Sequence, residues 1–128
     1  MRLLLDTHAL LWWVTDDPQL SYIARSAIAD PANEVLVSAA SAWEIATKHR
    51  LGKLPMGGEV LSRFDELIVA DGFSHLPIHH GHAIRAGRYP LHHRDPFDRM
   101  LAAQSELEGV PLVTLDAAFE RLPIQALW

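Results

Sequence analysis

The sequence predicts an α/β fold, a three-layer α/β/α sandwich with a central, mostly parallel sheet of about four to five strands. Short runs of almost pure Leu and Val, typical of strands buried on both faces, alternate with longer segments of helical periodicity. The chain has 128 residues, of which 49% are hydrophobic, enough to bury a core of its own. We therefore expect a single domain over residues 1–128.

The first part of the chain gives two strands and three helices. An apolar run over 3–5 predicts the first strand, and a very apolar helix over 9–14 follows it and ends at a Thr-Asp-Asp-Pro turn. Apolar spacing predicts a helix over 20–29, which an Asp-Pro-Ala-Asn turn ends. The run over 35–38 is the second strand. A longer helix over 42–51 then precedes a glycine suited to cap it.

The remainder repeats the pattern. Spacing of apolar residues predicts a helix over 59–70, and a strand over 72–76, a weak helix over 78–86 and a polar loop over 87–94 come next. The last predicted elements are a helix over 96–107 closed by Gly109, a strand over 110–114 whose early proline suits a first residue, and a fifth strand near 124–126. Strands that alternate with helices predict a parallel sheet covered on both faces.

Composition limits the possible functions. The chain has no cysteine, which rules out disulfides and thiolate metal sites and fits a cytoplasmic protein. Asp6 and His8 interrupt the longest apolar region, so we expect neither a signal peptide nor a membrane span. The net charge of −5 disfavours a broad, sequence-independent nucleic-acid binder.

Four acidic residues lie where predicted strands end or where the following helices begin. Asp6 directly follows the first strand, Glu44 comes one short turn after the second, Asp98 lies in the first turn of a helix, and Asp116 follows the fourth strand. Because parallel strands share one carboxyl edge, where ligands of open α/β sheets bind, these carboxylates are expected to converge.

Convergence of carboxylates has a cost that a divalent cation would remove. Like charges a few ångströms apart raise each other's pKa and destabilise the fold near neutral pH. An all-oxygen site without cysteine favours Mg²⁺ or Mn²⁺ over Zn²⁺. Such a site can activate water and stabilise the charge of a phosphodiester under attack, so the four acids are compatible with a phosphodiesterase.

Each acid also has a simpler interpretation. Ser41 and Glu44 match a capping box, so Glu44 could satisfy a helix amide. Asp95 is placed to cap the helix that begins at Pro96, with Asp98 favoured by the helix dipole, and Asp116 could be a turn or cap residue. Asp6 is the hardest to explain in this way, because a carboxylate after a buried apolar run needs a partner.

With these residues in view, the chain resembles PIN-domain ribonucleases, and among them the VapC-type toxins of bacterial toxin–antitoxin pairs. The resemblance rests on four segments in the expected order, namely 4–12 (LLDTHALLW), 37–48 (VSAASAWEIATK), 94–104 (RDPFDRMLAAQ) and 112–116 (LVTLD). Together they extend over most of the chain.

The resemblance implies a PIN-like fold and a Mg²⁺- or Mn²⁺-dependent endoribonuclease. Proteins of this kind usually form homodimers and are silenced by a small antitoxin protein. The matching site residues are the core acids Asp6, Glu44 and Asp98 and the more variable fourth acid Asp116. These four are expected to hold one or two metal ions, directly or through water, with the hydroxyl residues Thr7 and Thr114 nearby.

Basic residues are candidates for RNA binding. One group is Lys48, His49, Arg50 and Lys53, and the other is Arg85, Arg88, His92, His93, Arg94 and Arg99. A basic helix end also complements the helix dipole, and loop charges are often only solvated. We favour RNA contact for the second group, which leads into Asp98, and single out Lys48, Arg94 and Arg99. The histidines within 79–93 lack a spacing that repeats on one helix face, which disfavours a zinc site.

Two further questions stay open. The run Leu10-Leu11-Trp12-Trp13 is apolar all round, so it belongs to the core or to a dimer or antitoxin contact. A catalytically inert, partner-binding member of the same fold is the alternative function. A phosphoacceptor signalling domain is disfavoured, because His8 stands where a second acid is needed and no lysine follows Lys53.

Overall fold

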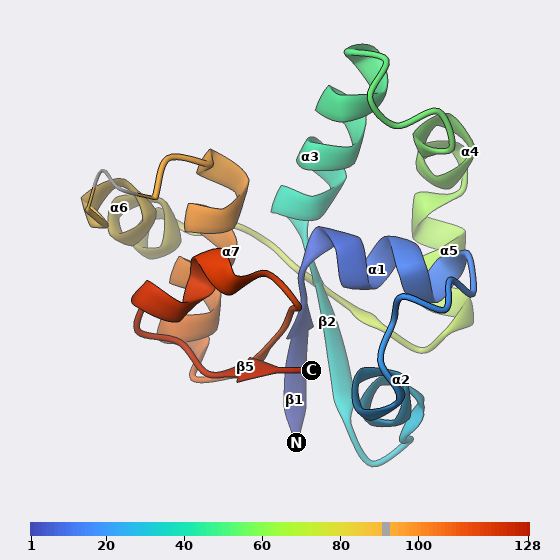
Figure 1. The fold of residues 1–128 in the computed structure, drawn as a ribbon, viewed down its shortest axis with the longest axis horizontal. Coiled ribbons are helices and arrows are strands. Elements are labelled where there is room, and N and C mark those ends of the chain that lie inside the picture. Colours follow the sequence, from blue (N-terminus) through green and yellow to red (C-terminus); the bar gives the residue numbers. More distant parts are fainter. Residues whose placement is uncertain (91–92) are drawn as a thin grey trace.

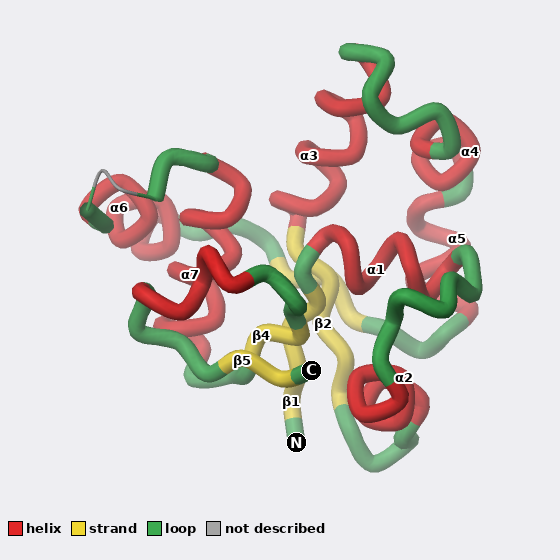
Figure 2. The backbone as a smooth tube through the Cα atoms, viewed as in Figure 1, coloured by secondary structure: helices red, strands yellow, loops and turns green. Residues whose placement is uncertain are grey.

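The computed structural model describes residues 1–90 and 93–128, and its central feature is a parallel sheet. Five strands lie in the order β3-β2-β1-β4-β5, and every neighbouring pair in the described part of the chain is parallel. This arrangement confirms the predicted α/β class (Figures 1 and 2). The strands are β1 (Arg2–Leu5), β2 (Glu34–Ser38), β3 (Ser74–Leu76), β4 (Leu112–Val113) and β5 (Ala126–Leu127).

β1 is the middle strand and aligns the others. Leu4 is paired with Leu36 of β2 on one side and with Leu112 of β4 on the other. All carboxyl ends therefore reach the same edge of the sheet. Figure 1 shows α1 (Thr7–Val14) and α3 (Ala39–Arg50) beginning at the tips of β1 and β2 on that edge.

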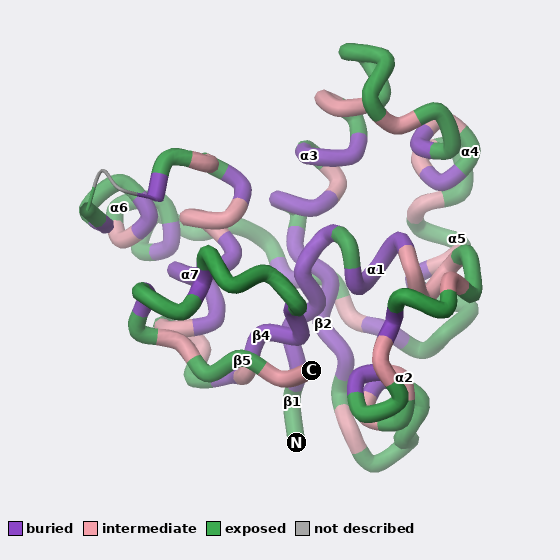
Figure 3. Tube along the Cα trace, viewed as in Figure 1, coloured by how far each residue is buried: buried purple, intermediate pink, exposed green. Residues whose placement is uncertain are grey.

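The helices form layers on the two faces of the sheet. Alternate side chains of a strand point to opposite faces, so Leu3 and Leu5 join one core while Leu4 joins the other. The first core includes apolar residues of α1, α2 (Tyr22–Ala29), α4 (Gly57–Ser62) and α5 (Phe64–Ala70). The second includes residues of α6 (His80–Arg88), α7 (Pro96–Glu108) and η1 (Ala117–Arg121). Figure 3 shows that the buried residues lie mainly on the central strands and on the parts of the helices next to them.

Several helices have other bounds than predicted. α1 begins two residues earlier than the predicted start at 9, and α2 begins two residues later than the predicted start at 20. The predicted helix 59–70 is divided at Arg63, whose N–H bonds to the carbonyl of Val60 only three residues earlier. The division allows α4 to pack on α3 while α5 packs on β3. The helix predicted over 42–51 begins earlier, at Ala39, because the Ser38 hydroxyl accepts a hydrogen bond from the N–H of Ala40. α6 begins two residues later than predicted and continues into the predicted loop, as far as Arg88.

The predicted end of α7 is confirmed. Gly109 adopts φ +66°, a left-handed conformation that suits glycine, and its N–H bonds to the carbonyl of Glu106. Among the described residues no helix combines the length and the apolar character needed to cross a membrane.

Candidate active site

Asp6 lies at the carboxyl end of β1 and also begins α1. Its Oδ1 accepts a hydrogen bond of 2.7 Å from the N–H of Ala9, so the carboxylate caps the helix. The residue is only 5% exposed. Burial raises the pKa of the Asp6 carboxyl, while hydrogen bonds from Thr114 and Ala9 act in the opposite direction. The buried position of Asp6 therefore disfavours the ionised form of its carboxyl group.

Glu44 lies in the second turn of α3 and is buried. The Thr7 hydroxyl donates a 2.5 Å hydrogen bond to Glu44 Oε1, and Lys48, one helical turn later, forms an ion pair with Oε2. The capping-box interpretation is wrong, because Ser38 caps α3 and Ser41 lies inside the helix. Glu44 instead connects α1 with α3, through Thr7.

Asp98 is the acid whose protonation the site changes most clearly. Asp95 caps α7, as predicted, by accepting hydrogen bonds from the N–H groups of Phe97 and Asp98 at 2.9 and 3.2 Å. Burial, followed by repulsion from Asp95, Glu44 and the acids at 116 and 6, raises the pKa of Asp98 from 3.8 to about 7. The structure therefore brings the other three predicted acids within electrostatic reach of Asp98.

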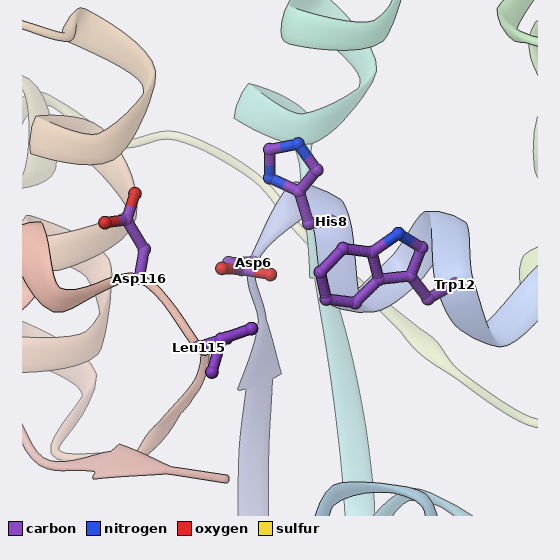
Figure 4. Close-up of a pocket in the computed structure, with 5 residues that line it drawn as sticks. All are labelled: Asp6, His8, Trp12, Leu115 and Asp116. Carbon is purple, nitrogen blue, oxygen red and sulfur yellow. The ribbon is translucent and has the colours of Figure 1, made fainter. Parts of the chain in front are cut away.

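Asp116 follows β4 and caps η1 through a 2.9 Å hydrogen bond from the N–H of Ala118 to its Oδ1. Its own N–H donates to the Thr114 hydroxyl at 3.0 Å. Asp116 is exposed, and together with Asp6 it lines a cavity of about 220 Å³. Figure 4 shows both carboxylates at this cavity.

His93 is a residue of the site that the sequence did not single out for this role. It is buried, and its Nε2 lies 3.6 Å from Asp98 Oδ2, with no hydrogen-bond partner in the described part of the chain. Its ring lies 5.7 Å from that of Phe119. The only available signal was its position five residues before Asp98, which says nothing about burial.

The predicted RNA-binding residues have unequal surroundings. The Arg99 guanidinium donates to the backbone carbonyls of residues 86, 87, 89, 90 and 93, at 2.5–3.2 Å. Lys48 is paired with Glu44, whereas Arg94 is exposed. Arg99 therefore ties α7 to the end of α6 and to the carbonyls of residues 89, 90 and 93, and its RNA contact stays a prediction. The predicted contact at His92 falls outside the described residues.

His79 and His82 form local contacts at the start of α6. His82 is buried, accepts the N–H of His79 through Nδ1 and lies 3.2 Å from Glu108 through Nε2. Within residues 1–90 and 93–128, no three His, Asp or Glu side chains are already gathered as a finished metal site.

The chemistry of the acidic cluster nevertheless fits Mg²⁺ or Mn²⁺. Asp6, Asp98 and Asp116 offer carboxylate oxygens, and their mutual repulsion is the kind that a divalent cation relieves. Mg²⁺ commonly uses one or two carboxylates and keeps several waters, so it does not require a closed cage of protein ligands. Glu44 fits a positioning role, because Lys48 already balances its charge.

A parallel sheet with acids at its carboxyl edge defines the class to which this chain belongs. Residues 3–125 match the family model of the PIN domain, so the chain belongs to the PIN domain family. This finding confirms the resemblance drawn from the sequence motifs.

Individual relatives agree with this assignment. Over 58 residues the chain is 43% identical to Ribonuclease VapC16 of Mycobacterium tuberculosis, a match that spans 45% of this chain and only 41% of that protein. The fold is similar to VapBC2 from Rickettsia felis bound to a DNA fragment from their promoter, with a TM-score of 0.71, 16% identity and coverage of 98% and 97% of the two chains. It is also similar to VapBC-1 from nontypeable Haemophilus influenzae, with a TM-score of 0.66, 18% identity and coverage of 98% and 96%. These two structures speak for the fold alone.

Proposed function

We propose that this protein is a metal-dependent endoribonuclease and the toxin of a toxin–antitoxin pair. The observation that carries the proposal is the placement of four acids at one sheet edge, where burial, followed by repulsion from Asp95 and from the other three acids, raises the pKa of Asp98 to about 7. Ribonuclease VapC16, which is similar to this chain over 58 residues, supports RNA as the substrate. Its RNA substrate would place the activity in the cytoplasm.

The side chains divide the work according to their surroundings. Asp6 and Asp98 would hold the Mg²⁺ or Mn²⁺ ion, and Asp116 would complete the site from its exposed position at the rim. Glu44 is kept in place by Thr7 and Lys48, so it would position the site and not bind the ion directly. A divalent ion held by these carboxylates would supply an activated water and would stabilise charge on the phosphodiester under attack.

Two protein partners follow from the family. VapBC2 and VapBC-1 are two solved structures with a similar fold, and by analogy we propose a small antitoxin that covers the acidic edge. We also propose a homodimer. Co-expression with the gene next to this one, followed by measurement of the mass of the purified complex, tests both partners.

The nuclease is tested with purified protein and a single-stranded RNA in Mg²⁺, in Mn²⁺ and in EDTA. We expect cleavage only with metal, and a loss of about 100-fold or more in kcat/KM for Asp6→Asn and for Asp98→Asn. Asp65→Asn is the matched control, because its side chain is 91% exposed and lies outside the acidic cluster. Cleavage by Asp6→Asn at the wild-type rate, without any effect of EDTA, would disprove the proposal. Metal binding without RNA cleavage would favour the inert, partner-binding alternative.

A further inference from the structure

Beside the acids, the structure has an apolar wall that catalysis of hydrolysis does not require. The cavity that contains Asp6 and Asp116 is also lined by His8, Trp12 and Leu115. Leu115 is 58% exposed, although it follows a fully buried strand. In Figure 4 the six-membered ring of Trp12 points toward Asp6, with His8 above it. A flat apolar surface thus continues directly from the carboxylates.

The aromatic side of this cavity is held in place by its neighbours. His8 and Trp12 lie one helical turn apart on α1, with ring centroids 5.6 Å apart. Trp128, next to β5, contacts Trp12 edge-on, with the two ring centroids 5.7 Å apart. The Trp12 ring is therefore positioned before any ligand arrives, which lowers the entropic cost of binding against it.

The charges of the protein explain why such a surface is needed for RNA. The chain carries a net charge of −5, and the site itself is acidic. Of the three cations predicted to contact RNA, Lys48 is paired with Glu44 and Arg99 with backbone carbonyls, whereas Arg94 is exposed. Attraction of phosphates by these three side chains therefore depends mainly on Arg94. Stacking of bases on aromatic side chains is the main alternative for single-stranded RNA.

We propose that His8, Trp12 and Leu115 form a subsite for one unstacked nucleobase of the RNA strand, next to the phosphate that is cleaved. Because the cavity shares Asp6 and Asp116 with the acidic cluster, a strand with its phosphate at these acids brings an adjacent base to the Trp12 ring. The subsite rests on the nuclease function proposed above. It deepens that function by adding a contact that selects single-stranded substrates.

The subsite is tested by removing the ring and the base separately. We expect Trp12→Leu to raise the KM for a single-stranded RNA about 10-fold, as for loss of one stacked base, with little change in kcat. Trp12→Phe should retain most of the affinity. An RNA with an abasic position beside the cleavage site should bind wild type about 10-fold more weakly and should add no further loss in Trp12→Leu. Equal abasic losses in both proteins would overturn the subsite.

Trp13→Leu is the matched control. Trp13 lies on the same helix, but its Nε1 donates to Asp71 and its ring lies against Phe73, away from the cavity. The Trp13→Leu substitution should leave KM unchanged, and circular dichroism should show that the variant is folded. If Trp12→Leu fails to fold, Leu115→Ala serves instead, because the exposed Leu115 side chain can be shortened without opening the core.

A direct binding measurement separates this proposal from the nuclease function. A second RNA carries 2-aminopurine at the position that was left abasic in the first. Its fluorescence should fall on binding to wild type and not on binding to Trp12→Leu. Metal-dependent cleavage together with unchanged quenching in Trp12→Leu would remove the subsite and leave the nuclease intact. Quenching that depends on Trp12, without any cleavage, would support base stacking on Trp12 and refute the nuclease function. Intact RNA binding together with loss of antitoxin co-purification in Trp12→Leu would make the cavity a protein-docking site and overturn the proposal.

Discussion

Replacement of Asp98 by Asn is expected to stabilise the metal-free protein above neutral pH, although the residue lies in the candidate active site. The rise of its pKa from 3.8 to about 7 means that ionised Asp98 is less favourable in the folded than in the unfolded state. At about 1.4 kcal/mol for each tenfold change in proton affinity, the rise corresponds to about 4 kcal/mol. Because 18% of the side chain is exposed, screening by solvent reduces this to about 2–3 kcal/mol.

The pH window follows from the direction of the shift. Below the unfolded value of 3.8 the Asp98 carboxyl is protonated in both states and contributes nothing. Between this value and about 7 the unfolded chain is ionised while the folded protein still holds the proton, so wild type loses stability as pH rises. Above about 7 the penalty is complete. The advantage of Asp98→Asn should therefore grow from near zero at about pH 4 to its full size at about pH 8.

Urea unfolding in EDTA, followed by circular dichroism at several pH values, measures this advantage. The Asp65→Asn control should show at most a small trend, because its carboxylate is 91% exposed and its contact with the His75 imidazole, at 3.5 Å, is open to solvent. Added Mg²⁺ should stabilise wild type more than Asp98→Asn, because binding to the folded state raises stability by mass action. An Asp98→Asn protein less stable than wild type at about pH 8 in EDTA, or a difference that does not change with pH, would refute the combined effect of burial and repulsion on the Asp98 carboxyl.

Three other predictions use the same surroundings. Affinity for Mn²⁺, measured by calorimetry, should weaken by up to about tenfold for each pH unit below about 7, because protons compete for Asp98; an affinity independent of pH would exclude Asp98 as a ligand. Lys48→Met should cost roughly 3 kcal/mol in urea unfolding by leaving buried Glu44 unpaired, and Glu44→Gln in the same chain should restore much of it; additive losses would contradict the pairing. Arg99→Lys should lower the free energy of unfolding by about 2–3 kcal/mol, because several hydrogen bonds to backbone carbonyls are lost. Arg94→Lys, at an exposed position, should lower it by almost nothing. Equal effects of the two substitutions would count against the assigned role of Arg99.

The fold and the meeting of the acids could be predicted because both depend on short-range signals. A buried apolar run followed by an acid marks the end of β1 at Asp6, and the Asp95-Pro96 pair marks the start of α7 and so places Asp98. The parallel order of the sheet then brings these positions to one edge without further information from the chain.

Other features depend on contacts between distant residues, which local patterns do not contain. Ser38 and Ser41 are both suitable caps, and the contact of Thr7 with Glu44, 37 residues away, accompanies the earlier start of α3. Arg99 is a cation in the sequence, but only the folded segment before α7 shows that carbonyl groups surround it. In the same way, His93 belongs to a basic run in the sequence and to a buried contact with Asp98 in the structure.

The structural and functional interpretations of the acids are compatible, because a carboxylate has two oxygens and can accept several hydrogen bonds. Asp6 and Asp116 each use Oδ1 to cap the element that follows, which fixes the direction of the carboxylate at the sheet edge. The other oxygen can take a second partner, such as a metal ion. Asp98 differs, since Asp95 provides the cap of α7 and Asp98 is left with the repulsion of its neighbours. Substitution by Asn keeps a capping oxygen at positions 6 and 116 but removes the charge at all three, so an Asn variant that stays folded and loses metal binding separates the two roles.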